Sequence, residues 1–218
     1  MNVELARFNM IEQQIRPWDV LDDRVLTTIA AIPRESFVAD GDQTLAFADI
    51  NLPIGHQQVM MAPKVEARLL QALAPTEGDT VLEIGTGSGF FTALLAKMAG
   101  QVYSVDIYAD FTTEARHKLA AQGLHNVTLE TGDASLNGWP KHGPYDAIAI
   151  TGSYPVLPEG YQRSLKMGGR LVAIVGEAPV MEAILITRIG EAAWSRESLF
   201  ETVLPPLRNA YCPPSFVF

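Results

Sequence analysis

The sequence predicts an α/β fold built on a doubly wound, mainly parallel sheet. From residue 79 onward, segments typical of strands alternate with segments typical of helices. Two of the strand segments, 147–150 and 171–175, are continuous apolar runs, which is typical of strands that are buried on both faces. A third, at 80–84, leads directly into a Gly-x-Gly-x-Gly turn over 85–89. A strand that enters such a turn and then a helix is the usual opening of a nucleotide site in this fold class.

The N-terminal third of the chain is expected to be mainly helical and irregular. Residues 24–32 carry apolar side chains at helical spacing, and Pro33 ends that helix. A second helix is expected over 64–74. Between them, residues 43–63 carry few strong signals for either helix or strand. We expect substrate recognition in this loop, because binding residues are often found on loops beside a rigid scaffold.

The rest of the chain is expected to alternate strands with helices. The expected strands are 80–84, 101–106, 126–131, 145–151, 169–175, 181–189 and 198–204, and the expected helices are 89–98, 109–122 and about 159–166. Gly190 is expected to turn the last two strands into an antiparallel hairpin, so that the sheet ends on an antiparallel strand. We therefore divide the chain into an N-terminal extension over 1–75, which holds the substrate loop, and a core over 76–218 that forms one compact unit.

Composition and charge limit the partners and the location that are expected for the protein. The chain has 16 Lys and Arg against 25 Asp and Glu, a net charge of −9, which argues against a nucleic-acid partner. The single cysteine, Cys212, and the lack of an export signal predict a reducing, cytoplasmic location. No apolar stretch approaches 18 residues, so no membrane span is expected, and the four histidines are not spaced as metal ligands.

The glycine turn indicates which kind of ligand is bound. Its spacing differs from the Gly-x-Gly-x-x-Gly pattern that places a pyrophosphate on a helix N-terminus. Glu83 lies inside the motif, and a carboxylate is a poor neighbour for a phosphate but a good one for a cation. The segment therefore predicts a nucleoside ligand that carries positive charge, and S-adenosylmethionine fits best.

Three acids lie at or just after the carboxyl ends of successive predicted strands, where ligands bind in open α/β sheets. Asp106 is expected to accept both ribose hydroxyls, and Asp133 to accept the adenine amine. Glu83 is expected near the methionine ammonium. NAD is the weaker alternative, because it would need the third glycine one residue later, although Asp106 would serve its ribose equally well. The expected cofactor-binding residues are Glu83, Gly85, Thr86, Gly87, Ser88, Gly89, Asp106, Ile107, Gly132, Asp133, Ala134 and Thr151.

Further segments follow one another in a characteristic order. They are Asp23-Arg-Val-Leu26, Ile32-Pro-Arg-Glu-Ser-Phe-Val38, Leu52-Pro-Ile-Gly55, Gln58, Ala62-Pro63, Val81-Leu-Glu-Ile-Gly-Thr-Gly-Ser-Gly89, Val102-Tyr-Ser-Val-Asp106, Leu124-His-Asn-Val127, Gly132-Asp133, Tyr145-Asp-Ala-Ile148 and Gly168-Gly-Arg-Leu-Val172. Through them the chain resembles the protein-L-isoaspartate O-methyltransferases over nearly its full length. Many methyltransferases share the glycine motif, whereas the segment that starts at Ile32 is much more specific.

The resemblance implies a Rossmann-like class I methyltransferase fold with a seven-stranded sheet. It also implies that S-adenosylmethionine donates a methyl group, leaving S-adenosylhomocysteine, to the α-carboxylate of an isoaspartyl residue in a damaged protein or peptide. A carboxylate is already ionised at neutral pH, so this reaction needs no general base. Catalysis then rests on alignment and on the exclusion of water.

The chain departs from the family pattern in the substrate loop. The family carries a Gly-Gln-Thr-Ile-Ser-(Gln/Ala)-Pro stretch whose serine hydroxyl meets the substrate carboxylate, and the serine position is Met61 here. Methionine has no hydrogen-bond donor. His56, Gln57 or Gln58 can supply one, so the candidate catalytic residues are Met61, His56 and Gln58. Two alternatives stay open: a different methyl acceptor on the same scaffold, or a protein that binds S-adenosylmethionine without catalysing transfer.

Overall fold

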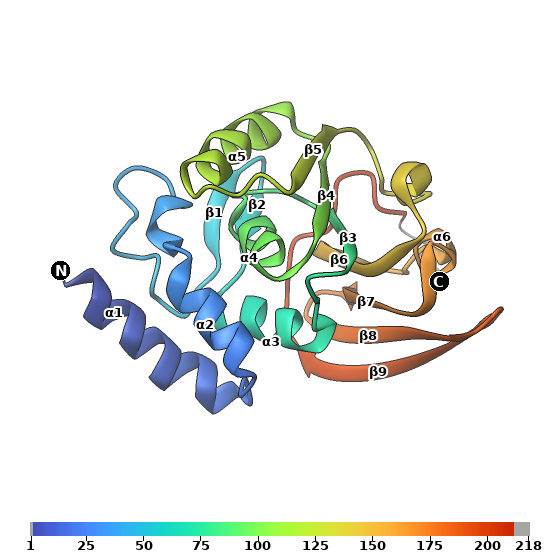
Figure 1. Ribbon diagram of the computed structural model, residues 1–218, viewed down its shortest axis with the longest axis horizontal. Helices are drawn as coiled ribbons and strands as arrows, with labels where there is room; N and C mark the ends of the chain where they lie inside the picture. Colours follow the sequence, from blue (N-terminus) through green and yellow to red (C-terminus); the bar gives the residue numbers. More distant parts are fainter. Residues whose placement is uncertain (1, 212–218) are drawn as a thin grey trace, which may run out of the picture.

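A seven-stranded sheet forms the centre of the protein, whose computed structural model describes residues 2–211 (Figure 1). The strands are β3 (Thr80–Ile84), β4 (Gln101–Asp106), β5 (Val127–Thr131), β6 (Tyr145–Tyr154), β7 (Leu165–Glu177), β8 (Val180–Gly190) and β9 (Ala193–Glu201). They lie in the order β5-β4-β3-β6-β7-β8-β9. The first five in this order pair in parallel, and β8 pairs antiparallel with both β7 and β9. The predicted doubly wound, mainly parallel sheet is confirmed, with antiparallel pairing at its end.

The strand order reverses direction at the middle of the sheet. From β3 the chain builds outward through β4 to β5, and it then returns to the other side of β3 to add β6 and β7. Open α/β sheets bind ligands at this kind of switch point, at the carboxyl ends of the strands. The sheet order therefore places a site where β3, β4 and β6 end.

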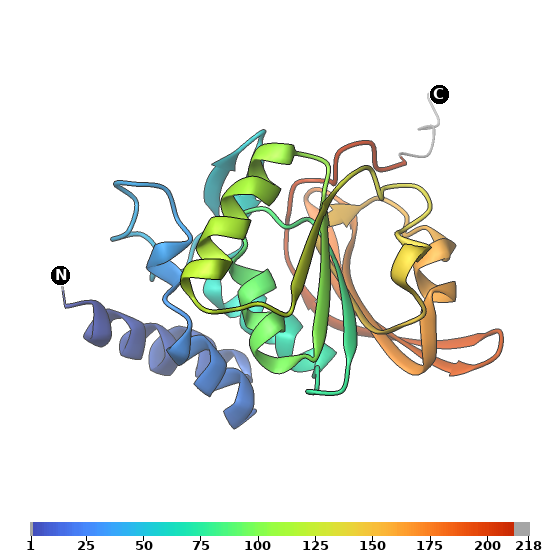
Figure 2. The ribbon, with the colours of Figure 1, turned by 45° about the horizontal axis from the view of Figure 1, so that its top comes forward.

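Alternate side chains of the central strands enter two separate apolar cores, one on each face of the sheet. Val81 and Val172 lie in one core, and Leu82 and Leu171 lie in the other. Three helices cover the first face: α3 (Pro63–Leu73), α4 (Phe90–Met98) and α5 (Ala109–Ala121). Figure 2 shows α4 and α5 next to each other on this side. The short helix α6 (Glu159–Arg163) contributes Tyr161 to the second core.

The N-terminal region is helical, as predicted. It contains α1 (Val3–Met10), a π-helical turn (Ile11–Ile15), a 3₁₀ turn (Arg16–Trp18), α2 (Asp23–Ala31) and a second 3₁₀ turn (Arg34–Ser36). The side chain of Asp22 caps α2 by accepting from the backbone N–H of Arg24. In Figure 1, α1 and α2 lie at the edge of the molecule that is remote from the tip of the β8–β9 hairpin. Ile15 and Val25 are buried in the same apolar core as Val81, and the division of the chain at residue 75 stays a prediction.

The substrate loop contains a small hairpin that the sequence did not predict. Strands β1 (Leu52–Gly55) and β2 (Gln58–Met60) pair antiparallel. His56 and Gln57 form the turn, with positive φ angles of 50° and 60°. Only three or four residues form each strand, which is too short to show a clear alternation of apolar and polar side chains.

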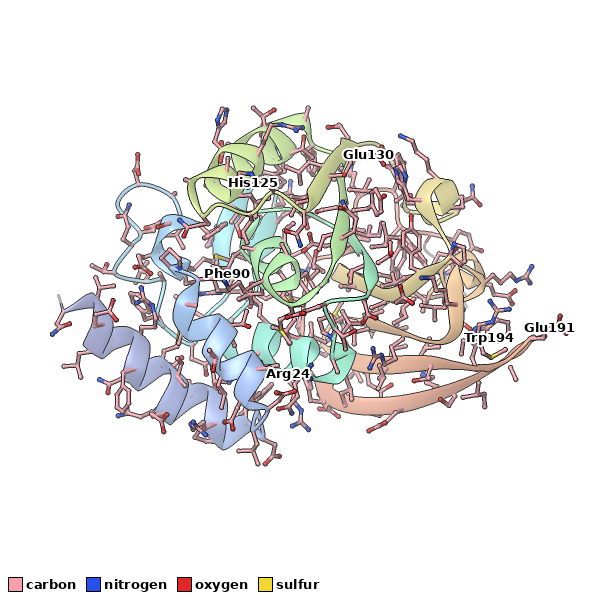
Figure 3. The ribbon with its side chains drawn as sticks, viewed as in Figure 1. Arg24, Phe90, His125, Glu130, Glu191 and Trp194 are labelled. Atoms are coloured by element: carbon pink, nitrogen blue, oxygen red, sulfur yellow. The ribbon has the colours of Figure 1, made fainter. Side chains whose placement is uncertain are left out.

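Three predicted boundaries near the C-terminus are wrong. Helix α6 ends at Arg163 rather than near 166, and β7 begins at Leu165 because that residue already pairs with Tyr145. The last strand covers 193–201 rather than 198–204. Most side chains of β9 are exposed, so it lacks the apolar run that marks a buried strand. Glu191 and Trp194, labelled in Figure 3, mark the tip of this hairpin. Cys212 lies outside the described residues.

Candidate active site

A cleft opens at the carboxyl ends of the parallel strands. Its volume is about 750 Å³, which includes space open to solvent. The β1–β2 hairpin contributes to its wall, and so do Leu207 and Arg208. Its lining is formed by Ile54, Gln58, Val59, Met60, Met61, Glu66, Ile84, Gly85, Thr86, Gly87, Ser88, Phe91, Val105, Asp106, Ile107, Tyr108, Phe111, Gly132, Asp133, Ala134, Ser135, Thr151, Gly152, Leu207 and Arg208.

The glycine turn between β3 and α4 brings backbone rather than side chains to the cleft. Gly85 has a φ of +98°, and a Cβ at this position would overlap the Thr151 hydroxyl oxygen. That hydroxyl donates to the carbonyl oxygens of Ile84 at 3.0 Å and Gly85 at 2.5 Å. Gly89 caps α4 with a φ of +84°, and a Cβ there would lie 2.9 Å from the Cβ of Ala115 on α5. Both glycines are therefore required by the packing around the turn.

Asp106 ends β4 and faces the cleft. Its Oδ2 accepts from the backbone N–H of Gly87 at 2.9 Å, and its Oδ1 accepts from that of Tyr108 at 2.9 Å. Burial raises the pKa of Asp106, and these two backbone N–H groups oppose the rise. An ionised carboxylate has about four acceptor positions, so each oxygen keeps one for a ligand hydroxyl. This arrangement suits the ribose contact that the sequence predicts.

Asp133 follows β5 and lies in a loop that several hydrogen bonds hold in place. Its carboxylate accepts from the backbone N–H of Ser135 at 2.9 Å and from Nδ2 of Asn209 at 2.8 Å. Although burial acts to raise the pKa of Asp133, these hydrogen bonds leave it below its usual value. The hydroxyls of Tyr154 and Tyr161 donate to the carbonyl oxygens of Ser135 and Ala134 at 2.9 and 2.6 Å. The loop therefore presents a fixed acceptor to the cleft.

Glu83 does not line the cleft. It is fully buried beneath the glycine turn, where its Oε2 accepts from Thr92 at 2.5 Å and Ser104 at 2.6 Å. Its Oε1 has no hydrogen-bond partner among the described residues. Burial raises the pKa of Glu83 to about 8, although the hydrogen bonds from the Thr92 and Ser104 hydroxyls act to lower it. The side chain links β3, β4 and α4, and its expected contact with the ligand ammonium stays a prediction.

The three candidate catalytic residues are not placed alike. Met61 and Gln58 line the cleft. Met61 is 3% exposed, and its carbonyl oxygen accepts from Arg34 at 2.6 Å. His56 lies outside the lining, with its Nε2 2.7 Å from Oδ2 of Asp110 and its ring stacked on Tyr108 at 3.9 Å. Met61 and Gln58 therefore share the cleft with the predicted cofactor residues, whereas His56 pairs with Asp110 on α5 outside the cleft lining.

Several lining residues were missed by sequence reasoning. Tyr108 and Ser135 each lie two residues after a predicted strand-end acid, so a search of the residues that follow those acids would have found them. Phe111 is one turn further along α5. Leu207 and Arg208 carried no such signal, because they follow the last strand and reach the cleft only through the tertiary fold.

Among residues 2–211, no group of three or more His, Cys, Asp or Glu side chains is placed to hold a metal ion. Within the same residues, no helix is both long enough and apolar enough to cross a membrane.

The cleft fits the ligand that the sequence predicts. A glycine turn that excludes a Cβ at residue 85, and two carboxylates at the ends of β4 and β5, suit a nucleoside whose ribose and adenine need acceptors. The fold and this site define a Rossmann-like class I methyltransferase, whose cofactor is S-adenosylmethionine rather than NAD.

Comparison with known proteins gives the family. The profile of the family described as protein-L-isoaspartate(D-aspartate) O-methyltransferase matches residues 6–209. The chain is 38% identical over 210 residues to protein-L-isoaspartate O-methyltransferase 2 of Pelobacter propionicus, covering 96% of this chain and 93% of that one. It is 39% identical over 202 residues to the enzyme of Rhodopseudomonas palustris, covering 92% of each. The chain belongs to this family of S-adenosylmethionine-dependent O-methyltransferases.

Solved structures agree on the fold. A putative protein-L-isoaspartate O-methyltransferase from Plasmodium falciparum, crystallised with S-adenosyl-L-homocysteine, superposes with a TM-score of 0.79. It is 20% identical in sequence, and the match covers 95% of this chain and 99% of that one. Family membership favours neither alternative raised by Met61, a different acceptor or a protein without catalytic activity.

Proposed function

We propose that the protein transfers a methyl group from S-adenosylmethionine to the α-carboxylate of isoaspartyl residues in proteins or peptides. One observation carries the proposal: a single cleft contains both the acids placed for the cofactor, Asp106 and Asp133, and the acceptor-loop residues Gln58 and Met61. Methyl transfer requires donor and acceptor to be aligned in one enclosed space. The names of the relatives support the choice of acceptor.

Some residues of the cleft bind the cofactor in this proposal, and others exclude water from the reacting groups. When bound, the cofactor supplies a methyl group on a positively charged sulfur. In this proposal Asp106 would hold the ribose hydroxyls and Asp133 the adenine amine, and the backbone of the glycine turn would contact the rest of the cofactor; the backbone donors to both carboxylates support these roles.

The acceptor side of the cleft keeps water out. Ile54, Val59, Met60 and Met61 form an apolar wall there. An anion that attacks a cation loses charge as the bond forms, so a site with little water favours the transition state over the separated ions. The acceptor carboxylate is ionised at neutral pH, and no residue is needed to remove a proton from it.

A labelled-methyl assay tests the proposal. The wild-type protein should transfer label to an isoaspartyl peptide and not to the same peptide with normal aspartate. The label should be released as methanol by mild alkali, because a carboxyl methyl ester hydrolyses under those conditions and a methylated amine does not. Asp106→Ala should abolish transfer. Equal labelling of both peptides, or label that resists alkali, would contradict the proposed acceptor.

We also propose a cytoplasmic location and a protein or peptide as the partner. The single cysteine among 218 residues supports a reducing compartment, since export would favour disulfide-rich chains. Cell fractionation with antibody detection tests the location, and recovery in a membrane or secreted fraction would contradict it.

A further inference from the structure

Arg208 contributes a positive charge to the cleft. Among the described residues that line it, no other is a lysine, arginine or histidine. The side chain is exposed, and no hydrogen bond or ion pair joins it to another described residue. In a chain with a net charge of −9, an unpaired guanidinium in the cofactor cleft is the exception and calls for a physical explanation.

The backbone on both sides of Arg208 is held in place. Pro205 and Leu207 bond to Ser153 at the end of β6: the Ser153 N–H donates to the Pro205 carbonyl at 3.1 Å, and the Leu207 N–H donates to the Ser153 carbonyl at 3.0 Å. On the other side, Asn209 donates to Asp133 at 2.8 Å. The position of Arg208 at the cleft is therefore built into the fold and does not depend on its own side chain.

The acidic residues that line the cleft do not pair with the positive charge of Arg208. Asp106 is engaged by two backbone N–H groups, and Asp133 by the N–H of Ser135 and the amide of Asn209. The third, Glu66, forms a buried ion pair with Arg34. Each of these carboxylates thus accepts from donors other than Arg208, and no hydrogen bond or ion pair joins any of them to Arg208.

The acceptor wall lacks the donor that an incoming carboxylate needs. Its side chains from β1, β2 and Met61 are apolar apart from Gln58, whose Nε2 donates to the carbonyl of Pro206 at a long 3.4 Å. This contact joins the acceptor loop to the segment that carries Arg208. The two loops therefore meet at the cleft, where Arg208 from one loop and Met61 from the other both contribute to the lining.

We propose that Arg208 binds the carboxylate of the methyl acceptor and takes over the role of the hydroxyl that is absent at Met61. The inference rests on the proposed function. A guanidinium can donate two parallel hydrogen bonds to a carboxylate. Each carboxylate oxygen then keeps a second lone pair for attack on the methyl group. Gln58 is close enough to the same segment to contribute a further donor.

The anion could instead be the carboxylate of the cofactor itself, so the test compares the two sources. Wild-type protein, Arg208→Gln and Arg208→Lys are titrated by calorimetry, with S-adenosylhomocysteine present, against an isoaspartyl peptide and against its analogue with a carboxamide in place of the α-carboxylate. Affinity for S-adenosylhomocysteine is measured separately. Arg163→Gln is the matched control, because this side chain is 71% exposed and pairs only with Glu159 on α6.

The wild type and Arg163→Gln should bind the carboxylate peptide at least about tenfold more tightly than the carboxamide. Arg208→Gln should abolish this preference and leave affinity for S-adenosylhomocysteine unchanged. Arg208→Lys should keep part of the preference, because lysine supplies the charge without the planar pair of donors. In turnover, Arg208→Gln should raise KM for the peptide more than it lowers kcat.

Three results would overturn the inference: a wild type that binds both peptides equally, an Arg208→Gln variant that keeps the preference, or a variant that loses affinity for S-adenosylhomocysteine alone. The last result would assign Arg208 to the cofactor carboxylate. The proposed function fails differently. A wild type that prefers the carboxylate peptide through Arg208 but does not methylate it would refute the proposed reaction and leave the role of Arg208 intact.

Discussion

Replacing Arg34 with methionine should test how the acceptor loop is anchored. Arg34 is 1% exposed, and it makes three contacts. Its Nη1 pairs with Glu66, its Nε donates to the carbonyl of Ala46 at 2.8 Å, and its Nη2 donates to the carbonyl of Met61 at 2.6 Å. The guanidinium also lies 4.8 Å from the ring centre of Phe90, which Figure 3 labels beside α4. Methionine has a similar length but no donor.

We expect Arg34→Met to lower the free energy of unfolding by about 3–5 kcal/mol. Removing one partner of a buried ion pair costs about this much, because the other charge is left uncompensated. Burial already raises the pKa of Glu66 to about 7 even with Arg34 present, so in the variant part of this cost should be met by protonation of the Glu66 carboxyl at neutral pH. Since domains of this kind are stable by only about 5–15 kcal/mol, the loss should be easy to measure.

Urea unfolding of the wild type, Arg34→Met and the double variant Arg34→Met/Glu66→Met measures this effect. The double variant should recover part of the loss, because replacing a buried pair by apolar side chains also removes the buried carboxyl group that Arg34→Met leaves without its partner. It should still show reduced kcat/KM, since the carbonyl of Met61 has lost its donor in both variants. A single variant within about 1 kcal/mol of the wild type would refute the reasoning, as would a double variant no more stable than the single one.

Three further predictions concern the cleft and the turn beneath it. The pKa of Glu83 is raised from 4.5 to about 8 on folding, so its contribution to stability should be complete below about pH 4.5 and lost as the pH rises to about 8. Between these pH values the free energy of unfolding should therefore fall with pH, and it should fall less steeply in Glu83→Gln. Met61→Ser adds a hydroxyl at the family's acceptor position, and its kcat/KM for an isoaspartyl peptide should exceed that of Met61→Ala by about tenfold. Asp106→Ala should weaken S-adenosylmethionine binding at least about tenfold in calorimetry, because it removes charged hydrogen bonds to the ligand.

Each of these has a control within the chain. The pKa of Glu66 is also raised by burial, so the free energy of unfolding of Glu83→Gln should still fall with pH, but less steeply than in the wild type. An unchanged dependence on pH would contradict the raised pKa of Glu83. Met61→Ala matches the volume lost in Met61→Ser, and equal activity of the two would show that a hydroxyl adds nothing here. Asp110→Ala removes an exposed acid on α5 that pairs with His56 and lies outside the cleft lining, and a loss equal to that of Asp106→Ala would contradict the ribose role.

The core of the fold could be predicted from the sequence because its signals are local. The run of apolar residues before Gly85 forms β3 over the predicted range 80–84, and β4 likewise covers 101–106. The strand-end acids Asp106 and Asp133 both line the cleft, since parallel strands bring their carboxyl ends to one edge of the sheet. The family also followed from the sequence, through short segments whose order along the chain is specific.

Tertiary packing decided the parts of the site that no local pattern encodes. Glu83 belongs to the glycine motif, yet its side chain points under the turn to Thr92 and Ser104, because the alternation of β3 places residue 83 on the face that α4 covers. His56 is held by Asp110, 54 residues away. Arg208 reaches the cleft only because its segment bonds to Ser153. Local sequence patterns were enough to predict the fold, the family and the methyl donor, whereas contacts between distant segments decided which side chains line the cleft.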